Sequence, residues 1–155
     1  MRKLLQTISL IALAILWILS VQALTGPDAL PSRIPTHFDI QGNPNAWGSP
    51  NGILLLPAIG TAIFLLIGLL SRNPAKFNYP VRVTPQNRDR LYALALQMTE
   101  SIQAETICLF AVLQYAILHA FRAGHFTLPP VIVPTGVALI IVTTLSHIVA
   151  MRRAG

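Results

Sequence analysis

The feature that most constrains this chain is an uncharged apolar run near its start, Leu4–Leu24. A helix of that length rises about 1.5 Å per residue and spans roughly 31 Å, which matches the hydrocarbon core of a bilayer. Three more apolar runs follow, at roughly 52–70, 91–121 and 131–151. The sequence therefore predicts an all-α fold, a polytopic membrane four-helix bundle forming a single domain over residues 1–155.

Composition supports a surface that faces lipid. Charged residues make up 10% of the chain and hydrophobic residues 54%, whereas a soluble domain carries about 25% charged residues. So few charges cannot cover a soluble protein, so we expect the lipid bilayer as the main partner. The net charge of +6 does not indicate nucleic acid, because the charges separate the apolar runs instead of forming one patch.

The first apolar run has an alternative interpretation as a cleaved signal peptide. Arg2 and Lys3 precede the run, and Val21-Gln22-Ala23 resembles a cleavage site. The apolar part of a signal peptide is usually about 7–15 residues long, however. The greater length of Leu4–Leu24 favours a retained membrane helix.

Lysine and arginine are distributed unevenly between the two sides that four spans would create, which predicts the orientation. Arg33 and Arg122 lie on one side. The other nine lie on the opposite side: Arg2, Lys3, Arg72, Lys76, Arg82, Arg88, Arg90, Arg152 and Arg153. We expect the cytoplasmic (bacterial inner) membrane, with both termini and the loop 71–84 in the cytoplasm and the loop 25–51 outside.

The third predicted helix is longer than a bilayer requires. Thr84 is a suitable N-cap and Pro85 a suitable first helical residue, so the helix would run over 85–121. Its length of about 55 Å exceeds the roughly 30 Å of the bilayer core. We expect its first turns to project into the cytoplasm or lie at the interface; the alternative is a kink or break near residues 97–100.

The external loop contains the most distinctive residues of the chain. Its segment 30–52 is rich in proline and glycine, which set turns. A loop this long in a small membrane protein indicates a function beyond connecting two helices. Its polar and aromatic residues are the candidate ligand-binding set, namely His37, Asp39, Asn43, Asn45 and Trp47. Trp47 has an alternative role as an interfacial anchor, which is the commoner one for tryptophan beside a span.

Residues of this loop and of the segment after the second run form a recognisable pattern. In the loop they are Leu30-Pro31, Ile34-Pro35-Thr36-His37-Phe38, Gly42 and Trp47-Gly48. After the second run they are Phe77-Asn78-Tyr79-Pro80-Val81, Thr84 and Asn87. The pattern resembles the domain of unknown function 1648, which occurs in bacterial membrane proteins similar to the Sdp immunity protein. The resemblance implies a binding, immunity or signalling protein that recognises an extracellular ligand, such as a peptide, through this loop.

A metal site is a second interpretation of the loop. His37 and Asp39 would point the same way in an extended segment, and His119 and His125 lie at the same predicted end of the third helix. The alternative is that His37 bonds the loop backbone and Asp39 caps a turn at residues 41–42. No standard ligand spacing is matched, so we predict no metal and no cofactor.

Two acids lie inside the third apolar run. Glu100 and Glu105 are five residues apart, so they point about 140° apart around a helix and do not form one paired site. We expect Glu105 to pair with His147 of the fourth helix, at a similar depth. That pair would serve as a proton relay, as a ligand site or, more commonly, as a polar contact between helices.

Catalytic motifs are absent from the sequence, including GxSxG and HExxH. The second hypothesis is a membrane-embedded enzyme or transporter component that uses Glu100, Glu105, His147 or the His37–Asp39 pair. A structural subunit is the third, with a possible homo-oligomer through small residues such as Gly60 and Gly68.

Overall fold

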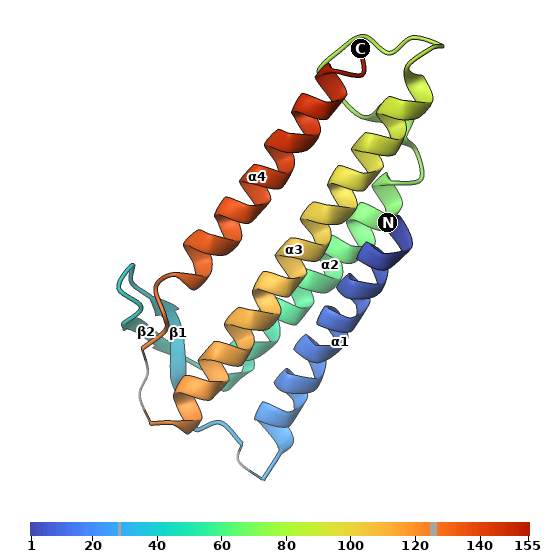
Figure 1. The fold of residues 1–155 in the computed structure, drawn as a ribbon. Coiled ribbons are helices and arrows are strands. Elements are labelled where there is room, and N and C mark those ends of the chain that lie inside the picture. Colours follow the sequence, from blue (N-terminus) through green and yellow to red (C-terminus); the bar gives the residue numbers. More distant parts are fainter. Residues whose placement is uncertain (28, 125–126) are drawn as a thin grey trace.

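The computed structural model describes residues 1–27, 29–124 and 127–155, and within them it contains four long helices (Figure 1). These are α1 (Arg2–Thr25), α2 (Leu55–Leu70), α3 (Arg88–Arg122) and α4 (Ile132–Arg152). Two short strands and two 3-10 turns lie in the connections: β1 (Ile34–Phe38), β2 (Pro44–Gly48), η1 (Pro50–Leu54) and η2 (Pro74–Lys76). The predicted helical bundle is confirmed, with a small β-hairpin added to it.

All four described helices, with η1 continuing into α2, are long and apolar enough to cross a membrane. At most 28% of the most apolar window of any helix is buried inside the protein, and in α4 the share is 0%. Apolar side chains exposed over whole helices indicate a lipid environment, because water would penalise such a surface. The chain therefore has the structure of a multi-pass membrane protein.

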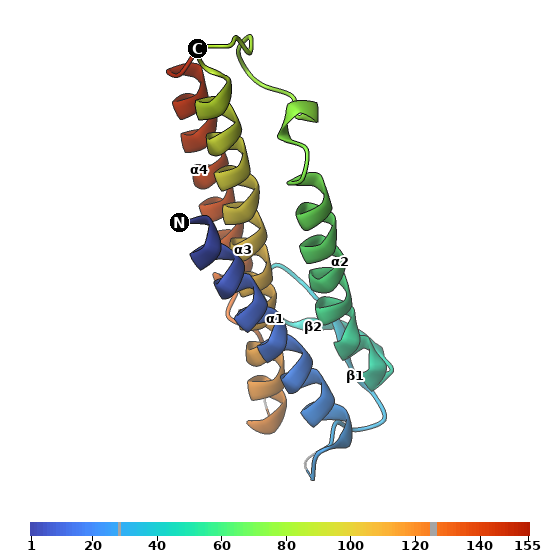
Figure 2. The same ribbon diagram turned by 90° about the vertical axis from the view of Figure 1, so that its right-hand side faces the viewer.

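Helix α3 is the centre of the bundle, because α1, α2 and α4 all pack against it (Figures 1 and 2). The middle of the core is formed by Ala12, Leu16 and Ile107, from α1 and α3. Gly60 of α2 is buried against this region, and a Cβ there would make an ordinary contact with the Leu13 side chain at 3.4 Å. A Cβ at Gly68 would meet nothing within 4 Å, so Gly68 makes no close helix contact within the described residues.

The two ends of the bundle differ in character. The hairpin end holds β1, β2 and a core of Ala23, Ile53 and Leu118. The opposite end, which we call the basic end, carries the exposed cations Arg72, Lys76, Arg82, Arg88, Arg90, Arg152 and Arg153. There α3 and the last turns of α4 continue beyond the first residue of α1 (Figure 1).

The segment between α2 and α3 folds as a packed cap on the basic end. Its Phe77, Tyr79 and Val81 side chains pack against a core of Leu91, Ala95 and Met151. Tyr79 stacks on Tyr92, with ring centroids 5.7 Å apart, and its hydroxyl donates to the Pro74 carbonyl. Burial raises the pKa of the Tyr79 hydroxyl, and the neighbouring Tyr92 adds to the shift.

The start of α3 differs from the prediction. The helix begins at Arg88 with Asn87 as its N-cap, and residues 85–87 form a turn instead of the first helical residues. The physical reason is the Asn87 amide, which accepts from the Thr84 N–H at 2.8 Å and donates to the Arg82 carbonyl at 3.1 Å. From Arg88 the helix is continuous to Arg122, so the alternative of a break near residues 97–100 is excluded.

Asn87→Ala is expected to lower the free energy of unfolding by about 1–3 kcal/mol, because it removes two hydrogen bonds from a buried side chain. Thermal unfolding of the detergent-solubilised protein measures the loss. Gln86→Ala, at the neighbouring exposed position, is the control and should change little. Equal effects of the two substitutions would show that the amide does not hold the turn.

Candidate functional site: a pocket beneath the hairpin

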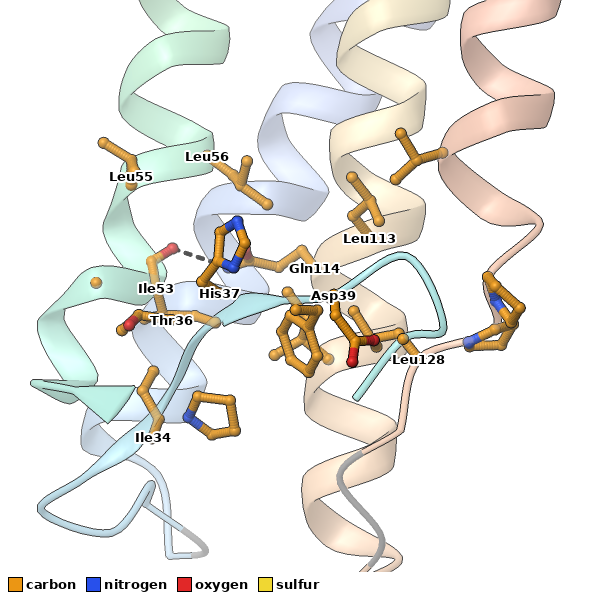
Figure 3. Close-up of a pocket in the computed structure, with 18 of the residues that line it drawn as sticks. Ile34, Thr36, His37, Asp39, Ile53, Leu55, Leu56, Leu113, Gln114 and Leu128 are labelled. Carbon is orange, nitrogen blue, oxygen red and sulfur yellow. Dashed lines mark hydrogen bonds between the residues drawn. The ribbon is translucent and has the colours of Figure 1, made fainter. Parts of the chain in front are cut away.

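A pocket of about 930 Å³ lies between the hairpin and the ends of α2, α3 and α4 (Figure 3). One wall is the segment 34–40, which contains β1. The other walls come from one face of α3, from Gly52, Ile53, Leu55 and Leu56, and, within the segment 128–134, from Leu128, Pro129, Pro130, Val133 and Pro134. Most of these side chains are aliphatic or proline, and the polar ones are Thr36, His37, Asp39 and Gln114. Such a lining, apolar with a few polar groups, is typical of ligand sites.

The hairpin closes over this pocket because its turn is tightly built. Asp39 Oδ1 accepts from the N–H groups of Gln41 and Asn43, which fixes the turn between the strands. Gly42 adopts a φ of 85°, in the left-handed region that favours glycine. Asp39 therefore caps a turn at residues 41–42, which was the alternative to its role as a metal ligand.

The turn is docked on the segment that leads into α4. The Leu128 N–H donates to the Gly42 carbonyl at 2.9 Å. A Cβ on Gly42 would lie 2.0 Å from the Leu128 carbonyl oxygen, so only glycine permits this approach. One backbone contact thus joins the first connection of the bundle to the last, and both of its residues line the pocket.

His37 lies on the pocket side of β1 and is held by β2. Its Nδ1 is 2.5 Å from Asn45 Oδ1, and because an amide oxygen only accepts, Nδ1 is the donor. The partner of His37 is thus a side chain of the neighbouring strand and not loop backbone. This contact orients the imidazole over the pocket (Figure 3).

Gln114 is the most deeply placed polar residue of the lining. Its side chain is 0% exposed, and its Nε2 donates to Ser20 Oγ of α1 and to the Ile53 carbonyl. Its Oε1 is buried and has no hydrogen-bond partner among the described residues. A buried acceptor without a partner costs about 1–3 kcal/mol, so this atom favours a ligand that donates a hydrogen bond.

The five candidate loop residues divide into two groups. His37 and Asp39 line the pocket, whereas Asn43, Asn45 and Trp47 do not. Asn43 and Asn45 instead support the hairpin through their bonds to Asp39 and His37. Trp47 lies on β2 opposite Pro35 and is 43% exposed.

The predicted histidines do not gather into a metal site in the described part of the chain. There, no three side chains of histidine, cysteine, aspartate or glutamate are placed to share a metal ion. His119 lies on the exposed face of α3 against Tyr115, with ring centroids 5.9 Å apart. His125 lies outside the described residues.

The two acids of α3 have different partners. Glu100 is 2% exposed; its carboxylate accepts from Arg2, at 2.8 Å for the closest contact, and from Gln6 at 3.2 Å. Glu105 Oε1 accepts from the Thr143 hydroxyl at 2.6 Å. The predicted bond from Glu105 to His147 is wrong, because the His147 imidazole bonds the Thr143 carbonyl one turn back on its own helix.

Gln114 and the 128–134 segment were not among the predicted site residues. Gln114 carried a usable signal, since an amide inside an apolar span needs a partner or a ligand. The 128–134 segment carried none, because its contact with Gly42 depends on the packing of α4.

Comparisons with known proteins found a matching family model and an uncharacterised relative. A family model described as domain of unknown function (DUF1648) matches residues 8–61, which include most of α1, the hairpin and the start of α2. An uncharacterised protein of Archaeoglobus fulgidus is 31% identical over 144 residues, covering 81% of this chain and 75% of that protein. No solved structure matches the chain.

Proposed function

The chain belongs to the family of the domain of unknown function 1648, and we propose that it is a membrane protein that binds an extended apolar peptide in the pocket beneath the hairpin. The observation that carries this proposal is the position of β1. Its five residues and Asp39 all line the pocket, so the strand runs along one wall for its full length.

The free edge of β1 supports a peptide as the ligand. In the described part of the chain the sheet has two strands, so β1 pairs with β2 on one side and with no strand on the other. An unpaired edge is a template for an added strand, whose backbone hydrogen bonds give affinity while alternate side chains enter pockets. Pro35 has no N–H, so the added strand would pair mainly through the residues around it.

The pocket chemistry supports an apolar peptide. Leu113, Ile117 and Val133 present apolar surface for its side chains. A peptide N–H placed at the inner wall would donate to Gln114 Oε1 and remove the cost of a buried acceptor. At the rim, His37 and Asp39 would meet its polar groups.

The orientation of the chain completes the proposal. The nine cations at or near the basic end favour a cytoplasmic location for that end, with both termini inside. The hairpin and its pocket would then face the outside of the cytoplasmic membrane. A protein that captures an apolar peptide there would serve in immunity against a secreted peptide or in signalling, as the family resemblance implies.

The test is the binding of a dansyl-labelled hexapeptide of alternating leucine and threonine to the protein in lipid nanodiscs, followed by fluorescence anisotropy. Empty nanodiscs correct for partition into lipid. We expect saturable binding, and at least about tenfold weaker binding of the same peptide N-methylated on alternate residues, because N-methylation removes the donors that strand addition needs. Equal binding of both peptides would overturn strand addition.

Filling the pocket provides the matched protein variant. Leu113→Trp adds a large ring at the half-buried pocket wall, and Leu66→Trp adds the same ring on the exposed surface of α2. We expect Leu113→Trp to weaken hexapeptide binding by at least about tenfold and Leu66→Trp to leave it within about twofold. Unchanged binding to a folded Leu113→Trp protein would contradict the proposed pocket.

A further inference from the structure

We propose that a second hollow, lined by α1, α3 and α4, binds a lipophilic organic cation through the carboxylate of Glu105. This hollow has a volume of about 560 Å³ and shares no lining residue with the pocket beneath the hairpin. It lies within the helical part of the bundle, with Leu5 of α1 on one side and Leu139 of α4 on the other. Because the hollow lies among membrane-span helices, a ligand would reach it from the lipid and not through the pocket beneath the hairpin.

Glu105 is the one charged residue among those that line the hollow, and the other lining side chains are apolar apart from those of Ser101 and Thr135. Its Oε1 accepts from Thr143, whereas its Oε2 is buried and has no hydrogen-bond partner among the described residues. Within the same part of the chain no lysine, arginine or histidine forms an ion pair with it. Glu100, five residues earlier on the same helix, shows the contrast, because Arg2 and Gln6 occupy its oxygens.

A carboxylate without an ionic partner is costly in an apolar membrane region, and a counter-charge beside it would lower that cost. A metal ion is a poor candidate, because no three suitable ligands come together in the described residues. A strongly hydrated inorganic cation would also lose its water shell against aliphatic walls. An organic cation with apolar substituents needs neither a set of metal ligands nor a water shell. Its charge would meet Glu105, and its substituents would contact side chains such as Ile8, Leu109 and Leu139.

The walls around Glu105 have a shape that admits such a ligand. Gly136 of α4 lies so close to α3 that a Cβ there would be 2.6 Å from the Leu109 side chain. This contact holds α4 against α3 near the level of Glu105, while α1 lies on the other side of α3 from α4 (Figure 1). The hollow lined by these three helices would give a cation dissolved in the bilayer a lateral route to the carboxylate.

The experiment measures the binding of radiolabelled tetraphenylphosphonium to the intact protein in phosphatidylcholine nanodiscs. Neutral lipid keeps adsorption of the cation to the bilayer low. We expect saturable binding to the wild-type protein and at least about tenfold weaker binding to Glu105→Gln, which keeps the shape of the side chain without the charge. Leu113→Trp, in the other pocket, should leave this binding within about twofold, which separates the inference from the proposed peptide function.

Two further variants make the result decisive. Leu139→Trp narrows the hollow but keeps the carboxylate, so it should also weaken binding, even if Glu105→Gln fails to fold. Asp89→Asn removes an exposed acid at the basic end and should leave binding unchanged. The proposal is overturned if the wild-type protein shows no saturable binding, if a folded Glu105→Gln binds as well as wild type, if Leu139→Trp has no effect, or if Asp89→Asn weakens binding equally.

Discussion

Replacing Gly42 with alanine is expected to undock the hairpin and lower the free energy of unfolding by about 2–4 kcal/mol. A φ of 85° costs an L-residue about 1–2 kcal/mol. The new Cβ would in addition lie 2.0 Å from the Leu128 carbonyl oxygen, so the hydrogen bond from Leu128 to Gly42 cannot survive unchanged. Thermal unfolding in detergent and limited proteolysis of the 38–44 turn report the two effects.

Gly124 supplies the matched control for this substitution. It also has a positive φ, of 72°, but a Cβ there would meet nothing within 4 Å. Gly124→Ala should therefore lower the free energy of unfolding only by the backbone conformational cost, about 1–2 kcal/mol, and should leave the proteolysis of the hairpin unchanged. Equal losses at the two glycines would mean that the contact with Leu128 does not hold the hairpin in place.

Arg2→Gln is expected to lower the free energy of unfolding by about 2–3 kcal/mol, because it leaves Glu100 buried with Gln6 as its remaining side-chain partner. Arg2 is partly exposed, its side chain being 47% accessible, so the loss should fall below that for a fully buried pair. Lys3→Gln removes a neighbouring exposed cation and should cost little.

A double-mutant cycle isolates the contribution of this ion pair. Glu100→Gln alone should also lower the free energy of unfolding. In the Arg2→Gln/Glu100→Gln double variant this decrease should be smaller than the sum of the decreases in the two single variants. We expect a coupling free energy of about 1.5–3 kcal/mol, as for other charge-assisted hydrogen bonds. Additive losses would show that the bidentate contact contributes nothing to the association of α1 with α3.

The helices were predictable because their signal is local. An uncharged run of sufficient length predicts a span from residues that are neighbours in sequence, and α1 extends only slightly beyond the predicted 4–24. The hairpin was not predicted, since β1 is five residues long and contains Pro35, which weakens any strand pattern. Its position depends on the docking of Gly42 against Leu128, far along the chain.

The candidate site was predictable only in part, because some of its residues are brought together from distant parts of the chain. His37 and Asp39 belong to a distinctive loop, and both line the pocket. Gln114 reaches the same pocket from α3, and no sequence pattern connects it to the loop. The partner of Glu105 was placed one turn too far along α4, because the choice between Thr143 and His147 depends on side-chain rotamers that the sequence does not specify.

A peptide site beneath the hairpin can be tested by identifying what the protein carries in its own membranes. Wild-type, Leu113→Trp and Leu66→Trp proteins would each be purified in mild detergent and denatured, and the released molecules identified by mass spectrometry. We expect an apolar peptide from the wild-type and Leu66→Trp proteins that is at least about tenfold depleted from Leu113→Trp. Release of the same molecules in the same amounts from all three would contradict a peptide site beneath the hairpin.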